Sequence, residues 1–162
     1  MKTARVIFSL LVTSLFMSLN ATAFAQPAPQ FVLNSAAGTI NLANYKGKVV
    51  YLDFWASWCG PCRKSFPWMN LMQEKYHDLG FKIIAVNLDE DKNKAEQFLK
   101  ETPANFTIAY DPTNKVARSY KVKGMPSSYL IDRKGNILSE HQGFFSTSKE
   151  NLEQAMRKAL AQ

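Results

Sequence analysis

The stretch that decides the fold is Trp58-Cys59-Gly60-Pro61-Cys62, which holds both cysteines of the 162-residue chain. An apolar run at 49–54 precedes it, and apolar residues recur at three- or four-residue spacing after it. The first pattern predicts a buried strand and the second an amphipathic helix. A Cys-x-x-Cys pair at a strand-to-helix junction is typical of a redox site, because a helix N-terminus stabilises the reactive thiolate.

The position of each cysteine predicts its role. Cys59 would stand at the helix start, partly exposed, and act as the nucleophile with a lowered pKa. Cys62 lies one turn inward and would be the resolving thiol, which attacks Cys59 in a mixed disulfide. The alternative is a purely structural bridge, but a two-residue gap closes almost no loop and restrains the unfolded chain little. A chain of this length can also bury a core without staples.

Asp53 is the only acidic residue in the apolar run before the cysteines. If it is buried, desolvation raises the pKa of its carboxyl and lets it exchange a proton with Cys62 during resolution. The alternative is a carboxylate at the strand end, in contact with water. Apolar neighbours on both sides favour the buried, proton-handling interpretation.

The first 25 residues have the pattern of a secretory signal. Lys2 and Arg5 precede an apolar stretch at 6–19, and Ala23-Phe24-Ala25 matches a small-x-small cleavage site. The apolar stretch is short for a membrane span, which needs about 20 residues. We therefore predict a cleaved signal peptide at 1–25, a single mature domain at 26–162 and a periplasmic location, with an uncleaved anchor as the alternative.

Composition excludes some functions. Hydrophobic residues make up 46% of the chain and charged residues 20%, which is ordinary for a globular domain. The formal net charge is +7, but the basic residues are scattered and form no stripe or reading motif. Nucleic-acid binding is therefore not expected.

Sequence patterns typical of strands alternate with patterns typical of helices, which predicts an α/β fold with a mixed central sheet and helices on both faces. A hairpin at 31–42 comes first. Further strands are expected at 49–54, 81–88, 106–109, 127–131 and 136–141, and helices at 62–79, about 95–99, about 116–120 and after Thr147. Thr147 and Glu150 have the spacing of a capping box at the start of the last helix.

The segment at 50–62 resembles the active-site segment of thioredoxin. The resemblance includes an acidic residue six positions before the first cysteine, Asp53, and a proline five positions after the second, Pro67, where the family's helix is kinked. Three features resemble the exported TlpA/ResA-type branch of the family. They are an N-terminal pair of short strands, a strand-helix insertion at about 90–120 and the sequence segment at 124–137. The resemblance implies a thioredoxin-like fold over the whole mature chain.

The same resemblance implies a substrate surface made of Trp58, Gly60, Pro61, Met125 and Pro126. It implies a cis peptide bond before Pro126, which would offer the backbone of Met125 to an extended substrate strand. Trp58 would shield the cysteines, or else serve as a generic core aromatic. Gly60-Pro61 is the dipeptide of the reducing thioredoxins, whose potential is about −270 mV, against about −120 mV for a strong periplasmic oxidant.

Two positions depart from the TlpA/ResA-type pattern. Ser65 stands where that branch usually has a glutamate, and Asp53 stands where it tends to have an amide. The expected site is thus closer to general thioredoxin than the outer scaffold is. These departures weaken any expectation of a narrow role in haem attachment.

The expected function is a periplasmic thiol:disulfide oxidoreductase that reduces disulfides in protein substrates and is recharged by a membrane dithiol donor. Its redox group is the Cys59–Cys62 pair itself, without a further cofactor or a metal. A disulfide oxidant or isomerase is the alternative of the same class. A Cu(I)-binding chaperone is the alternative of another class, but it needs a third ligand, and neither His77 nor His141 falls in a segment expected to reach the pair. These motifs do not define an oligomeric state.

Overall fold

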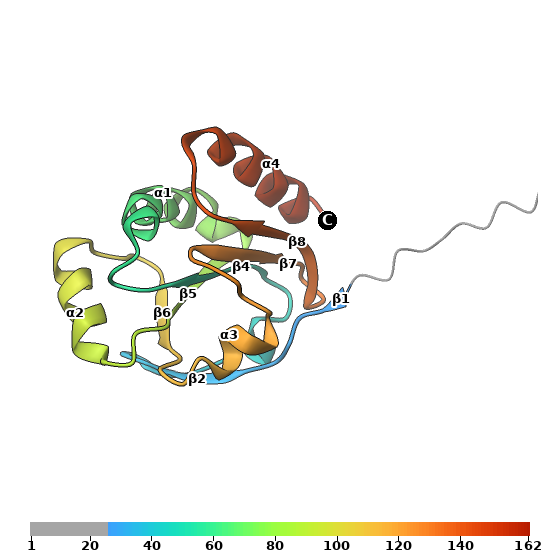
Figure 1. Cartoon of the computed structure of the whole chain (residues 1–162). Coiled ribbons are helices and arrows are strands. Elements are labelled where there is room, and N and C mark those ends of the chain that lie inside the picture. The colour runs from blue at the N-terminus through green and yellow to red at the C-terminus, as the bar shows by residue number, and fades with distance from the viewer. Residues whose placement is uncertain (1–25) are drawn as a thin grey trace, which may run out of the picture.

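The computed structural model describes residues 26–162, and the predicted signal peptide at 1–25 lies outside them. An eight-stranded mixed sheet runs through the domain, with helices on both sides (Figure 1). The strands are β1 (Gln26–Pro27), β2 (Val32–Ser35), β3 (Gly38–Asn41), β4 (Val49–Trp55), β5 (Phe81–Asn87), β6 (Thr107–Tyr110), β7 (Ser127–Ile131) and β8 (Asn136–Gln142). The helices are η1 (Leu42–Tyr45), α1 (Gly60–Tyr76), η2 (His77–Leu79), α2 (Lys92–Glu101), α3 (Lys115–Ser119), η3 (Ser146–Ser148) and α4 (Lys149–Leu160).

The strand order across the sheet is β1-β8-β7-β4-β5-β6-β2-β3. Strands β4, β5 and β6 are parallel to one another, and every other pairing is antiparallel. Parallel neighbours need crossover connections, and α1 and α2 supply them. The α/β thioredoxin-like fold predicted from the sequence is therefore confirmed.

β4 is the central strand, and all seven of its residues are buried. Its side chains alternate between two cores. Val49, Tyr51 and Trp55 belong to the core beneath α1, α2 and α4, whereas Leu52 and Phe54 belong to the core beneath α3 and η1. By this alternation Asp53 points to the face covered by α1 and α4.

Helix α1 carries the second cysteine on its buried side. Its buried residues include Phe66, Met69, Met72 and Tyr76, at the spacing expected for one helical face, and Pro67 lies inside it. Among the helices of residues 26–162, none has the length and apolar character that crossing a membrane requires.

The two predicted additions are present. Strands β2 and β3 form an antiparallel hairpin that pairs with the edge of β6, and α2, β6 and α3 are inserted between β5 and β7. The predicted capping box is wrong. Thr147 lies inside η3, and α4 begins at Lys149. The Ser148 hydroxyl accepts from Phe145 N and donates to Phe145 O, which closes a 3-10 turn ahead of the helix.

Candidate active site

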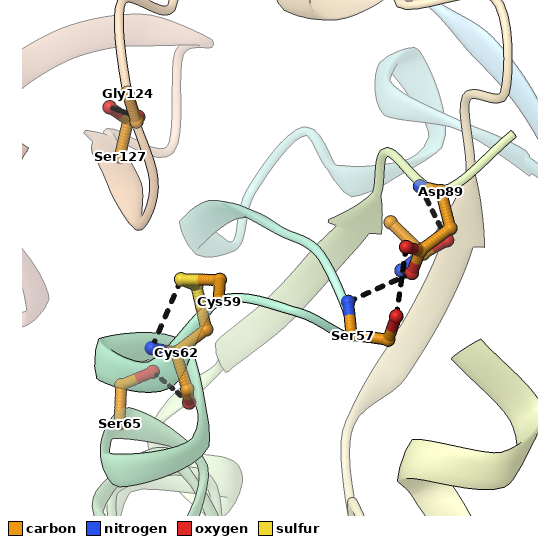
Figure 2. The surroundings of a disulfide bond; sticks show 8 residues. Ser57, Cys59, Cys62, Ser65, Asp89, Gly124 and Ser127 are labelled. Atoms are coloured by element: carbon orange, nitrogen blue, oxygen red, sulfur yellow. Dashed lines mark hydrogen bonds between the residues drawn. A yellow bond between two sulfur atoms is a disulfide. The ribbon is translucent and has the colours of Figure 1, made fainter. Parts of the chain in front are cut away.

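The two cysteines form a disulfide at the start of α1, with their Cα atoms 5.3 Å apart. Cys59 is the N-cap residue, and its sulfur accepts a hydrogen bond from the backbone N–H of Cys62 at 3.2 Å (Figure 2). The first turn of a helix has N–H groups without intrahelical partners and the positive end of the macrodipole. A thiolate on Cys59 would therefore be stabilised at this point, as the sequence predicts.

The dipeptide between the cysteines fits the first helical turn. Pro61 lies at a position where no intrahelical N–H bond is required. A Cβ atom built on Gly60 would meet no heavy atom within 4 Å. Packing therefore does not require glycine at residue 60, and both residues of the dipeptide are exposed next to the disulfide.

Burial differs from the expectation at two positions. Cys59 is only 5% exposed and Cys62 is fully buried, so the nucleophile is less accessible in the disulfide form than the sequence led us to expect. Trp58 is 73% exposed, so the alternative of a core aromatic is wrong, and its role as a shield of the cysteines stays a prediction. Because β4 ends at Trp55, residue 58 lies beyond the alternation that buries its neighbours.

The loop before β7 faces the cysteines from across the site. The Met125–Pro126 bond is cis. Trp58 and Met125 line one shared hollow of about 490 Å³. Pro126 O accepts a 2.7 Å hydrogen bond from the backbone N–H of Gly143. The Ser127 hydroxyl donates to Gly124 O at 2.6 Å (Figure 2). These bonds fix the loop from both sides.

Asp53 is 2% exposed in the middle of β4, between Ala85 of β5 and Ser128 of β7. Within residues 26–162, no protein hydrogen-bond partner reaches its Oδ2 atom. Burial therefore raises the pKa of this carboxyl well above its ordinary value. The burial expected from the apolar run is confirmed, and the carboxylate-in-water alternative is wrong.

A contact that the sequence did not reveal secures the segment before Cys59. The carboxylate of Asp89 accepts hydrogen bonds from the backbone N–H and the hydroxyl of Ser57, both at 2.9 Å (Figure 2). It also accepts one from the side-chain amide of Asn87 at 2.7 Å. Asp89 itself is 5% exposed. Its position just after the C-terminal end of β5, next to the end of β4, is the signal that could have revealed it, because polar residues at those ends meet in space.

Ser65 occupies the position where the TlpA/ResA-type branch usually carries a glutamate. It is 2% exposed, and its hydroxyl donates to Cys62 O at 2.9 Å (Figure 2). A small side chain that bonds to its own helix thus fills this position beneath the disulfide. The departure noted in the sequence is also a difference in chemistry, since no ionisable group stands at residue 65.

The two histidines lie away from the disulfide. His77 begins η2 at the opposite end of α1, a 17-residue helix, and that length corresponds to about 25 Å. His141 lies on β8, two strands from β4. Within the described part of the chain, no group of three or more His, Cys, Asp or Glu side chains is placed to hold a metal ion.

The Redoxin family pattern matches residues 24–156. The chain belongs to the Redoxin family. It is 38% identical over 132 residues to thiol-disulfide oxidoreductase ResA of Bacillus thuringiensis subsp. konkukian, covering 81% of this chain and 75% of that protein. It is 36% identical over 122 residues to ResA of Bacillus subtilis, covering 75% and 68%.

Solved structures agree with this placement of the Redoxin-family chain. A Chlorobium tepidum protein assigned as thiol:disulfide interchange protein DsbE has a TM-score of 0.83 and 54% identity, covering 84% of this chain and 96% of that one. StoA from Bacillus subtilis has a TM-score of 0.68 and 27% identity, covering 80% and 97%. The chain is thus a TlpA/ResA-type member of the thioredoxin superfamily and a thiol-disulfide oxidoreductase with a Cys59–Cys62 pair.

Proposed function

We propose that this protein is an exported reductant of disulfides in other proteins, recharged by a membrane dithiol donor. The observation that carries the proposal is the position of Cys59, which is the N-cap of α1 with Cys62 buried directly behind it. This arrangement favours attack by one thiolate and resolution by the other. The resemblance to ResA and DsbE-type proteins supports the same chemistry.

In the first step the Cys59 thiolate attacks a substrate disulfide. One substrate sulfur leaves as a thiolate and takes up a proton, and a Cys59–substrate mixed disulfide forms. Once Asp53 is ionised, Cys62 gives its proton to this carboxylate and attacks the Cys59 sulfur, and the second substrate sulfur leaves as a thiolate that takes up a proton. Two electrons pass from the dithiol to the substrate, the two substrate thiolates take up protons from solvent, and the Cys59–Cys62 disulfide is the product. No other redox group enters these steps.

Substrate would bind across the surface next to the disulfide. Trp58 supplies an exposed aromatic face, and Gly60 and Pro61 are exposed beside Cys59. The backbone of Met125, held by the bonds around Pro126, would pair with an extended substrate strand. Such backbone pairing accepts many sequences, which suits a reductant that acts on several proteins.

The reduction potential tests the direction of electron flow. The purified protein would be equilibrated in glutathione buffers while the two thiols are counted by alkylation. A value near that of thioredoxin, about −270 mV, is expected of a reductant. A value near about −120 mV, as in DsbA, would instead identify an oxidant. Fractionation of cells that produce the full chain tests export, and a product retained in the cytosol would contradict it.

A further inference from the structure

Asp53 has to release the proton that it receives, yet it is buried and sealed under α1. A row of polar side chains runs from it across three strands. Strand pairing places Asp53 of β4 opposite Ser128 of β7, and Ser128 opposite His141 of β8. Directly paired residues of antiparallel strands project to the same face of the sheet. All three side chains therefore lie on the face that α4 covers (Figure 1).

Tyr51 joins this row from the same face of β4. Its hydroxyl donates to Ser128 Oγ at 2.8 Å, and both residues are buried. That bond leaves the hydroxyl hydrogen of Ser128 available for another acceptor. Burial, and next the negative charge of Asp53, raise the pKa of Tyr51 well above its ordinary value, which agrees with a close approach of the two groups.

A small cavity continues the row toward β8. Its volume is about 10 Å³, and Tyr51, Ser128, Ser139 and His141 are among the residues that line it. This volume is about the smallest that holds one water molecule. The cavity surface is mostly apolar, and Leu130 of β7 and Leu152, Ala155 and Met156 of α4 complete its lining. His141 is the one lining residue with an imidazole, and no lining residue is a carboxylate or a lysine or arginine cation.

The two ends of the row share one property. Within residues 26–162, neither Asp53 Oδ2 nor His141 Nε2 has a protein hydrogen-bond partner, although both atoms are buried. Buried polar atoms are normally satisfied by protein or by ordered water. His141 as a whole is half-buried, in contrast to Asp53. Its ring therefore has one side on the cavity and another in contact with solvent.

We propose that Ser128, Tyr51, one water in this cavity and His141 form the route by which protons pass between Asp53 and solvent. The inference rests on the proposed function, because it takes Asp53 as the proton acceptor for Cys62. Before each resolution, the carboxylic acid form of Asp53 gives its proton to the chain of hydroxyls and water, and His141 Nε2 accepts it. The imidazole then releases a proton to bulk water, and Asp53 is again a carboxylate. His141 acts through Asp53 and does not touch the cysteines.

The test follows a single oxidation of the reduced protein by a peptide disulfide, observed in stopped flow. His141→Phe is expected to slow resolution of the mixed disulfide about tenfold, less than the 10²–10⁴-fold contribution of a direct acid–base group. The reduction potential is expected to stay unchanged, because a proton route changes the rate of the reaction and not the equilibrium between the reduced and oxidised protein. His141→Ala is expected to be slow as well and to recover in imidazole buffer, which a purely structural histidine would not do.

Matched variants separate the possible failures. His77→Phe removes the other histidine and should leave the rate unchanged. If Asp53→Asn slows resolution while His141→Phe does not, the route is wrong and the role of Asp53 stands. If Asp53→Asn leaves resolution as fast as in the wild type, the proposed function loses its proton acceptor. A crystal structure with a dry cavity, or His141→Ala without imidazole recovery, would also overturn the route.

Discussion

Asp89 holds Ser57 through both its backbone N–H and its hydroxyl, at 2.9 Å each. Ser57 stands two residues before the nucleophile, so this pair ties the end of β5 to the turn that delivers Cys59 to α1. The bonds of Asp89 to Ser57 and Asn87 nearly saturate one buried carboxylate. We regard it as a positioning group for the turn between β4 and α1.

Replacing Asp89 with Asn should loosen this turn. The variant keeps the shape of the side chain but loses a charged acceptor and leaves N–H groups poorly matched, which costs about 1–3 kcal/mol of unfolding free energy. Alkylation of Cys59 in the reduced protein should slow, because the sulfur is no longer held at the helix start. Glu90→Gln, at the exposed neighbouring residue, is the control and should change neither urea unfolding nor alkylation.

Asp53→Asn should stabilise the fold at neutral pH while it slows resolution. The raised pKa means that the folded state keeps a proton that the unfolded state loses. The wild type therefore loses stability as pH rises from about 4 toward the folded-state pKa. The Asn variant lacks this loss, so its advantage should grow with pH and exceed about 1 kcal/mol at pH 7.

Urea unfolding at several pH values measures that advantage. Asp78→Asn is the matched control, because the Asp78 side chain is 99% exposed. This control should follow the pH dependence of the wild type. Equal stability of wild type and Asp53→Asn at pH 5 and pH 8 would show that the carboxyl is not held in its neutral form.

The sequence predicted the groups whose signals are local. Cys59 and Cys62 are marked by their spacing, and Asp53 by being an acid within an apolar run. The Ser57–Asp89 contact joins residues 32 positions apart, and it becomes visible only when β4 and β5 are paired in register. The row from Asp53 to His141 likewise depends on two antiparallel registers, which no spacing within one strand encodes.

Trp58 and the start of the last helix show that periodicity does not predict the structure at the ends of helices and strands. Periodicity describes residues inside an element, whereas Trp58 follows the end of β4 and turns outward into solvent. At α4, Thr147 and Glu150 have the spacing of a capping box, but the Ser148 hydroxyl bonds to the backbone of Phe145, and the N-cap is Ser148, one residue later than predicted. Element ends depend on such competing local bonds.

Trp58→Ala should separate substrate binding from stability. Because Trp58 is 73% exposed, removal of its side chain should change the unfolding free energy by less than about 0.5 kcal/mol. If Trp58 provides substrate contact, KM for a protein disulfide should rise several-fold, while the rate with dithiothreitol, which needs no such contact, stays the same. A variant that reduces insulin with unchanged KM would remove Trp58 from the substrate surface.

Single cysteine replacements test the assignment of the two thiols. Cys62→Ser leaves the thiol at the helix start but removes the group that resolves the mixed disulfide. It should therefore accumulate covalent complexes with substrate proteins, visible on non-reducing gels and lost on reduction. Cys59→Ser should accumulate few, because Cys62 is fully buried and lies beyond the N-cap position that stabilises a thiolate. Cys59→Ser/Cys62→Ser is the background control. Equal trapping by the two single variants would contradict the roles given to Cys59 and Cys62.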